Sequence, residues 1–187
     1  HFGDAAEGGD LGEILSYCRA DTFFSALCRE AADISQELLE CVVEGVQRGK
    51  LRFSDLFPWK KRKNCNELYL PRPVMNISHD ECGKTLSYEE VREQSAERKK
   101  EKKRSFIRAS EMESYLQGRD ISAQPAFGEE ELRTQYNARE RRPYGIGAYH
   151  FMPDAGLYLI LSGNEECIAR LERLITLLGM TGIGGER

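Results

Sequence analysis

The chain has 187 residues, of which 40% are hydrophobic and 31% charged, and this length predicts one domain or one domain with a large insertion. The composition excludes a disordered chain, and no apolar stretch approaches the ~20 residues that cross a bilayer, so we expect a cytoplasmic protein without a membrane partner. The net charge of −4 argues against an indiscriminate nucleic-acid binder. The charge is nevertheless uneven, because residues 51–108 carry 15 basic and 9 acidic side chains whereas both flanking segments are acidic.

Two helices are predicted in the first third of the chain. Asp21 is a good N-cap, and apolar residues follow it at helical spacing, namely Phe24, Leu27, Cys28 and Ala31. Ser35 predicts the cap of a second helix with an apolar stripe of Leu38, Leu39, Val42, Val43 and Val46. Gly49 is a natural stop for that helix.

The middle third begins and ends with short strand-like runs. We expect strands at 51–54 and 105–108 and an extended piece at 68–73. Residues 76–104 are polar and end in a basic run, which is typical of a solvated helix or a mobile loop.

A short helix is expected after the strand at 105–108. Ser110 and Glu113 form a capping-box pattern for it, and it should end near Gly118. Residues 121–135 show no regular pattern.

The last third predicts a hairpin followed by a helix. Two strand-like runs, 148–152 and 157–161, flank the turn signal at 153–156. Asn164 should cap the helix, with Gly179 as its end and a core face of Ile168, Leu171, Ile175 and Leu178.

The order helix, strand, strand, helix makes up most of a ferredoxin-like β-α-β-β-α-β unit, so the predicted fold class is α+β. Its outer strands are expected before His1 and after Arg187. We therefore predict one domain over residues 1–187 with an insertion at 57–143, of which 57–108 is the basic part.

No spacing of residues predicts a catalytic or metal site. The chain contains neither the H-E-x-x-H nor the G-x-S-x-G motif nor a complete P-loop, and its three histidines, His1, His79 and His150, lie far apart. We expect no metal and no cofactor. His150 lies in a strand-like run and is expected to be structural, whereas His1 could act as an acid, a base or a hydrogen-bond donor.

Two segments are candidates for binding phosphate or RNA. Three glycines among residues 182–185 would let the backbone approach a ligand and direct successive N–H groups into one concavity, although a flexible connector is the alternative. Arginines next to Tyr136 and Tyr144 combine forked donors with stacking faces, as single-stranded RNA binders do. These arginines are Arg139, Arg141 and Arg142, for which a surface salt-bridge patch is an equal alternative.

A set of short motifs occurs in a characteristic order. The motifs are H-F-G at 1–3, D-T-F-F-S-A-L at 21–27, F-S-D-L-F-P at 53–58, L-P-R-P at 70–73, G-L-Y at 156–158 and G-I-G-G at 182–185. Together they resemble the RAMP superfamily of CRISPR-associated proteins, and within it the fourth Csm subunits of type III-A effector complexes.

This resemblance implies an RRM-like, non-catalytic subunit that holds the 5′ handle of the crRNA. It also implies docking to the large polymerase-like subunit, with the RAMP backbone subunits of the Csm complex stacking beyond. The residues carried over as RNA contacts are His1, Gly3, Asp21, Thr22, Ser25, Arg72, Gly182, Ile183, Gly184 and Gly185. Members usually have lysine after the double glycine, whereas this chain has Glu186, which leaves Arg187 as the nearby cation.

Two alternatives belong to other functional classes. A metal-independent RAMP endoribonuclease that processes pre-crRNA would use His1 as its acid or base. A structural bridge would contact only protein. RNA binding without cleavage separates the subunit predicted here from both.

Overall fold

The computed structural model describes residues 14–63, 65–74, 87, 88, 92, 104–137 and 142–183. These residues form two compact units. Unit 1 comprises the described residues up to Pro58 and those from Phe127 onward, and unit 2 comprises those from Trp59 to Ala126. The insertion bounds expected from the sequence, 57–143, remain a prediction.

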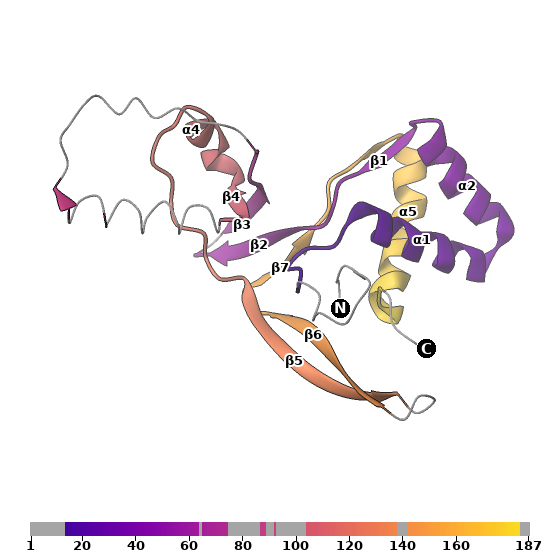
Figure 1. The fold of residues 1–187 in the computed structure, drawn as a ribbon. Coiled ribbons are helices and arrows are strands. Elements are labelled where there is room, and N and C mark those ends of the chain that lie inside the picture. Colours follow the sequence, from indigo (N-terminus) through magenta and orange to yellow (C-terminus); the bar gives the residue numbers. More distant parts are fainter. Residues whose placement is uncertain are drawn as a thin grey trace. The chain divides into compact units, whose positions relative to one another are not determined.

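Unit 1 contains three long helices and five strands, drawn in Figure 1. In chain order they are α1 (Ala20–Ile34), α2 (Gln36–Gln47), β1 (Leu51–Phe53), β5 (Gly128–Asn137), β6 (Arg142–Phe151), β7 (Ala155–Tyr158), β8 (Leu161–Gly163) and α5 (Glu165–Thr181).

Helix α1 is present as predicted, but its predicted cap is wrong. Arg19 is the N-cap residue and provides no side-chain cap, whereas Asp21 lies inside the first turn. The backbone N–H of Ala20 instead donates to Oδ1 of Asp55, at 2.6 Å. A residue distant in sequence therefore caps this helix, and helical periodicity cannot reveal such a partner.

The buried face of α1 also differs from the predicted one. Phe23, Leu27, Glu30 and Ala31 are buried. Phe24 and Cys28 are half-buried and pack at the edge of the core. The face turned inward thus contains a carboxylate, that of Glu30, which the apolar pattern did not mark.

Helix α2 confirms the prediction at both ends. Oγ of Ser35 accepts the backbone N–H of Leu38 at 3.1 Å. Gly49, which follows the helix, has φ +67°, a backbone conformation that glycine adopts without a steric penalty. Val42 is the fully buried member of the predicted stripe.

The strands β1 and β8 form an antiparallel pair in which Leu51 faces Gly163 and Phe53 faces Leu161. The predicted hairpin between 148–152 and 157–161 is wrong, because β6 pairs with β5 and β8 pairs with β1. The run at 148–152 lies at the end of β6, whereas the run at 157–161 is divided between the end of β7 and the start of β8, and partners distant in sequence supply the ladders.

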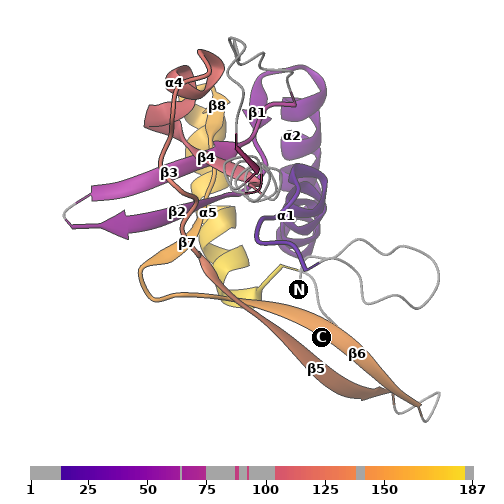
Figure 2. The ribbon, with the colours of Figure 1, turned by 60° about the vertical axis from the view of Figure 1, so that its left-hand side comes forward.

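The strands β5 and β6 form a long two-stranded ribbon that runs from Gly128, opposite Phe151, to Asn137, opposite Arg142 (Figures 1 and 2). Residues 121–135 were predicted to lack regular structure. The prediction holds for 121–127 and fails for 128–135, which lie in β5, because such a ribbon can leave both faces exposed and requires no apolar alternation. Leu132 and Tyr136 are in fact exposed.

Helix α5 begins as predicted, since Oδ1 of Asn164 accepts the N–H of Cys167 at 3.0 Å. It continues past Gly179 to Thr181, and Gly182 is the residue that takes a positive φ, +86°. Leu171 and Leu178 are buried as predicted, and Leu174 is buried as well.

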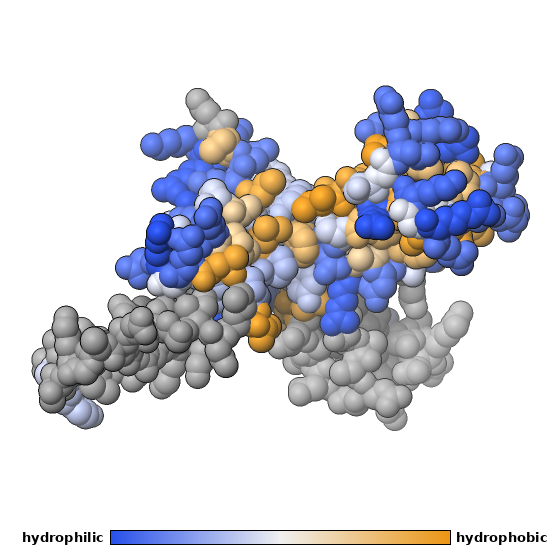
Figure 3. Space-filling view, turned by 90° about the horizontal axis from the view of Figure 1, so that it is seen from above, coloured by the Kyte–Doolittle hydropathy of each residue, from blue (hydrophilic) through white to orange (hydrophobic). Residues whose placement is uncertain are grey.

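The core of unit 1 lies between these helices and the β1–β8 pair. Its buried residues are Cys18, Phe23, Leu27, Ala31, Val42, Leu51, Leu171, Leu174 and Leu178. Figure 2 shows α5 beside α1 and α2, and on the face drawn in Figure 3 hydrophilic residues cover most of this helical part, at the right of the view. Cys41 of α2 is half-buried.

Unit 2 is built on antiparallel strands. The sheet has the strand order β4-β3-β2-β7, and β2 begins in unit 1, where the ring of Phe57 contacts that of Tyr158. The elements that complete the sheet and unit 2 are β2 (Phe57–Arg62), β3 (Cys65–Pro71), β4 (Phe106–Arg108), the 3-10 helix η1 (Ala109–Glu111) and α4 (Met112–Leu116). In this sheet Trp59 faces Leu68, and Leu70 faces Ile107.

The predicted strand at 105–108 is confirmed as β4, and the extended piece at 68–73 begins within β3. The capping box is wrong, because Ser110 lies inside η1 and the N-cap residue of α4, Glu111, makes no side-chain cap. Gly118 ends the helical turn with φ +70°, as expected. Within the described parts of both units, no helix has the length and apolar character needed to span a membrane.

Candidate nucleic-acid interface

Three of the predicted RNA-contacting residues lie together on the first two turns of α1. Asp21, Thr22 and Ser25 are all exposed. Oδ1 of Asp21 accepts the N–H of Thr22 at 2.6 Å and the Thr22 hydroxyl at 3.3 Å. The two hydroxyls can donate to phosphate oxygens, and the carboxylate can accept from a ribose 2′-hydroxyl but would repel a phosphate.

The described start of the glycine-rich segment, Gly182 and Ile183, is held tightly at the end of α5. The N–H of Gly182 donates to the carbonyl oxygen of Leu178 at 2.8 Å. The side chain of Ile183 packs against the core of unit 1. Because this side chain is occupied by packing, any RNA contact of Ile183 must use its backbone.

The start of α1 and the start of the glycine-rich segment lie on different sides of α1. Thr181, the last residue of α5, bonds to Glu30 on the buried face of α1. At 3.6 residues per turn, Asp21 and Ser25 lie about 180° and 140° around the helix axis from Glu30. Along the axis they lie about 14 Å and 8 Å from it. The helix therefore separates these two groups instead of joining them in one pocket.

The predicted contact Arg72 lies in unit 2. Its backbone N–H donates to the carbonyl oxygen of Ser105 at 2.9 Å, which continues the β3–β4 ladder beyond the last paired residues. The basic cluster that ends β2 is exposed at Lys61, Arg62 and Lys63. Lys60 donates its Nζ proton to the carbonyl oxygen of Ala126 at 2.7 Å.

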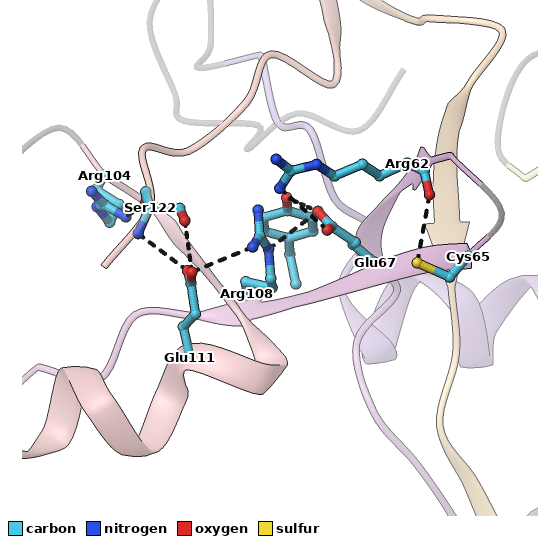
Figure 4. Close-up of polar contacts among 8 residues, drawn as sticks. Arg62, Cys65, Glu67, Arg104, Arg108, Glu111 and Ser122 are labelled. Atoms are coloured by element: carbon cyan, nitrogen blue, oxygen red, sulfur yellow. Dashed lines mark hydrogen bonds and ion pairs between the residues drawn. The ribbon is translucent and has the colours of Figure 1, made fainter. Parts of the chain in front are cut away.

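An ion-pair network in unit 2 was not predicted from the sequence, and Figure 4 shows it. The guanidinium of Arg108 lies between two carboxylates, with Nε 3.1 Å from Glu67 and Nη1 3.3 Å from Glu111. The Glu111 carboxylate also accepts the hydroxyl proton of Ser122 at 2.6 Å. The side chains of Arg108, Glu67 and Glu111 are only 17%, 16% and 23% exposed, so this arginine neutralises carboxylates and does not face solvent.

Tyr69 completes the same network. Its hydroxyl donates to Glu67 at 3.1 Å, and burial raises the pKa of Tyr69 above its usual value. Arg62 lies 3.5 Å from the other oxygen of Glu67. Tyr69 lies directly opposite Arg108, so these side chains could have been recognised as neighbours only if the pairing of β3 with β4 had been known.

The ribbon carries a second polar cluster. His150, which we expected to be structural, has Nε2 2.7 Å from Oε2 of Glu131, and the side chains are half exposed. Arg133 donates to the same carboxylate, and this bond, followed by the His150 contact, lowers the pKa of Glu131. The cluster connects β5 to β6 across the ribbon.

The remaining predicted site residues lie outside the part of the chain that the structure describes. They are His1, Gly3, Arg139, Arg141, Gly184, Gly185 and Arg187. Arg142 is described as a backbone position of β6, opposite Asn137. Among the described residues, no group of three or more histidine, cysteine, aspartate or glutamate side chains could hold a metal ion.

Comparisons with known proteins identify what this chain is similar to. No family model matches it. The CRISPR system Cms protein Csm4 of Mycobacterium tuberculosis (strain H37Rv) is 31% identical over the whole chain, and the Csm4 of Streptococcus thermophilus is 26% identical over the whole chain. The chain is Csm4-like. It spans little more than half of these relatives, 57% and 56% of their lengths respectively.

Solved structures agree with this relationship at the level of the fold. A chain in a crystal structure of a Csm1-Csm4 cassette in complex with cA4 matches 92% of this Csm4-like chain with a TM-score of 0.64 at 20% identity, and 64% of that chain is covered. A chain of a Csm3-Csm4 subcomplex of the type III-A CRISPR-Cas interference complex matches 90% with a TM-score of 0.56 at 17% identity, and 61% of it is covered. The resemblance drawn from the ordered motifs is confirmed, and the fold is mixed helix and sheet.

Proposed function

We propose that this Csm4-like chain is a non-catalytic, RNA-binding subunit of a type III-A CRISPR complex that holds the 5′ handle of the crRNA. The observation that carries the proposal is the 31% identity to a Csm4 protein over the entire chain. The motif order H-F-G, D-T-F-F-S-A-L, L-P-R-P and G-I-G-G points to the same family.

The fold of unit 1 supports an RRM-like ferredoxin domain as the framework. The antiparallel pair β1–β8 lies between α1 and α2 before it and α5 after it in the chain. This is the helix, strand, strand, helix part of the ferredoxin order. A long insertion between the paired strands, proposed at 57–143, contains unit 2 and most of the ribbon.

The available chemistry suits the backbone of a single-stranded RNA. Hydroxyl groups of Thr22 and Ser25 are exposed for phosphate oxygens, and glycine at 182 lets the backbone approach closely. Arg72, together with the arginines at 139, 141 and 142, would supply the cations. The chain's acidic net charge is compatible with this function because only the groove that binds RNA has to be basic.

The partners belong to the same proposal. The solved structures that match this fold contain Csm4 together with Csm1 or with Csm3. We propose that the present chain docks a large polymerase-like subunit of the Csm1 kind and contacts a backbone subunit of the Csm3 kind.

Binding without cleavage is the direct test of the proposal. The purified full-length protein is titrated into labelled single-stranded RNA of the repeat sequence in EDTA, with fluorescence anisotropy for binding and a denaturing gel for products. We expect saturable binding and intact RNA, with weaker binding to DNA of the same sequence. Handle-length products that disappear in His1→Ala would replace this proposal with the endoribonuclease, and no binding at all would leave a bridge that contacts only protein.

The salt dependence of binding tests which cations contact the RNA. On single strands each phosphate contact contributes about −0.7 to the log–log slope, so Arg72→Ala should flatten the slope by about 0.7. The matched control neutralises Lys99, Lys100, Lys102 and Lys103, which we assign to a solvated part of the insertion. A slope that changes in the lysine variant and not in Arg72→Ala would place the RNA groove at the basic run of residues 99–103 and not at Arg72.

A further inference from the structure

The two faces of the β2–β3 hairpin in unit 2 carry different side chains. In an antiparallel pair, directly opposite residues share a face, and every second residue along a strand returns to it. Glu67, opposite Lys60, therefore lies on the same face as Arg62, which is 3.5 Å away. This is the face with the ion-pair network (Figure 4). The other face carries two cross-strand pairs, Trp59 with Leu68 and Lys61 with Asn66.

The pair of Trp59 and Leu68 leaves apolar surface accessible to solvent on this second face. Leu68 is 42% exposed, and Trp59, its partner in register, is half-buried. Aromatic side chains on a sheet surface are the platforms on which RRM-type proteins stack unpaired bases. Such stacking tolerates any sequence, because every base has a π face.

Two exposed lysines accompany this apolar pair. Lys61 follows Trp59 by two residues on the same face, and Lys63 lies in the turn that joins β2 to β3. Among the residues that the structure describes, neither lysine has an ion-pair partner, whereas Arg62 on the opposite face pairs with Glu67. A base and its phosphates would engage the ring and the ammonium groups at once, so this combination favours a nucleic acid over a protein as the partner.

The backbone of Lys63 indicates that this lysine serves more than the turn. Its φ of +51° is the only positive value among the described residues other than glycine. A left-handed backbone favours glycine, asparagine or aspartate, and tight hairpin turns use these residues for that reason. Hairpin stability would place one of them at this position, so the presence of a cation points to a contact made by its charge.

We propose that this face of the β2–β3 hairpin is a contact site for single-stranded RNA. A base stacks on Trp59 beside Leu68, and phosphates next to that base bind Lys61 and Lys63. The inference rests on the proposed function and adds a site in unit 2 to the expected contacts. Arg72, one of those contacts, lies four residues after Leu68, which is about 13 Å along an extended strand.

The fluorescence of Trp59 reports on the stacking directly, because this residue is the only tryptophan in the sequence. The full-length protein is titrated with repeat-derived single-stranded RNA and with an abasic strand of the same length. Subtracting the emission of Trp59→Phe isolates the signal of this residue. We expect the RNA to quench it with the Kd obtained from anisotropy, and the abasic strand to leave it unchanged. Unchanged emission while anisotropy reports saturable RNA binding would overturn the stacking.

Substitutions of Trp59 measure the contribution of the ring to affinity. Trp59→Ala should raise the Kd for RNA by about fivefold or more, which corresponds to one stacked base. Trp59→Phe keeps an aromatic ring and should raise the Kd less. Equal Kd values for the wild type and both variants would overturn the role of the ring.

Lys63→Asn separates the charge from the stability of the hairpin. Asparagine suits the positive φ, so the Tm should stay the same or rise, while the log–log salt slope of RNA binding flattens by about 0.7. Lys50→Asn is the matched control, because Lys50 is an exposed lysine of unit 1, and it should leave the slope unchanged. A wild-type slope in Lys63→Asn would overturn the phosphate contact.

The outcomes separate this inference from the proposed function. Saturable RNA binding that no hairpin variant alters would overturn the inference alone. If the same variants instead lost the large subunit during co-purification, the face would be a protein-docking surface and not an RNA contact. A wild-type protein that binds no RNA would overturn the proposed function itself.

Discussion

Asp55 caps α1 although it is distant in sequence. Replacing it with alanine should lower the stability of the protein, because the first N–H of the helix then loses its acceptor. Its Oδ1 accepts the N–H of Ala20 at 2.6 Å. Cys18, close to Ala20, and Leu56, next to Asp55, form an antiparallel β-bridge. Its two backbone hydrogen bonds measure 3.2 Å and 2.8 Å and hold the two segments together. The backbone that carries the acceptor is therefore fixed next to the start of α1.

The expected loss in the free energy of unfolding follows from the type of hydrogen bond that is removed. Loss of an N-terminal capping side chain costs about 0.5 to 2 kcal/mol, and a short, part-buried bond from a carboxylate belongs near the upper end, at about 1.5 kcal/mol. For a chain of this size, each kcal/mol lowers the Tm by about 2 to 4 °C, so Asp55→Ala should melt about 3 to 6 °C lower. Asp55→Asn keeps the Oδ1 acceptor and loses only the negative charge near the helix dipole. This loss should lower the free energy of unfolding by about 0.3 to 1 kcal/mol.

The assay is thermal and urea unfolding followed by circular dichroism, with Asp21→Ala as the comparison variant. Asp21 lies inside the first turn, and its loss should cost about 0.3 to 1 kcal/mol, which is the dipole contribution of an exposed acid. The reasoning is refuted if Asp21→Ala destabilises the protein more than Asp55→Ala does, because that is the order expected when Asp21 is the cap.

Three further predictions concern glycines and a thiol. Gly179→Ala should raise the free energy of unfolding by about 0.5 to 1 kcal/mol, because Gly179 lies within α5 and a Cβ there would meet nothing within 4 Å; a lower Tm would restore Gly179 as the end of the helix. Gly128→Ala should accelerate hydrogen exchange along β5 and β6, since its Cβ would collide with the backbone carbonyl of His150; protection equal to the wild type would show that the ribbon does not need this close approach. Burial, followed by the charges of Asp55 and Asp21, raises the pKa of the Cys18 thiol from 9.0 to about 11. The unfolded thiol ionises first, so the free energy of unfolding should fall as pH rises from about 9 to about 11, and Cys18→Ala should remove part of that fall; identical pH profiles in urea titrations would contradict the assignment.

Local signals explain why the helix boundaries were largely predictable. Ser35 and Asn164 cap the helices that follow them, and each cap depends on a side chain and an N–H three residues further along the same chain. Gly49 ends α2 through its own backbone freedom. Such interactions need no tertiary partner, so their residues can be recognised directly in the sequence.

The candidate site was predictable only in part, because many of its contacts are made by residues that are distant in sequence. The ordered motifs indicated the family, and the structure places Asp21, Thr22 and Ser25 on one exposed stretch of α1. It also shows that Ile183 is committed to the core, which spacing along the chain could not reveal. The network around Arg108 was missed because its two carboxylates come from different elements, β3 and η1.

By itself, the sequence determined the helices, the short strands β1 and β4 and the resemblance to Csm4, since all of these depend on residues close together in the chain or on their order along it. Only the tertiary structure decided which strands pair, which aspartate caps α1 and where α5 ends. The run at 157–161 was expected to pair with its neighbour at 148–152, yet its last residue, Leu161, lies in β8 opposite Phe53, and this pairing buries Leu51 against the helices. Burial of residues distant in sequence outweighs the local turn signal here. A turn contributes little to the free energy of folding, whereas burial of the apolar core contributes most of the favourable part.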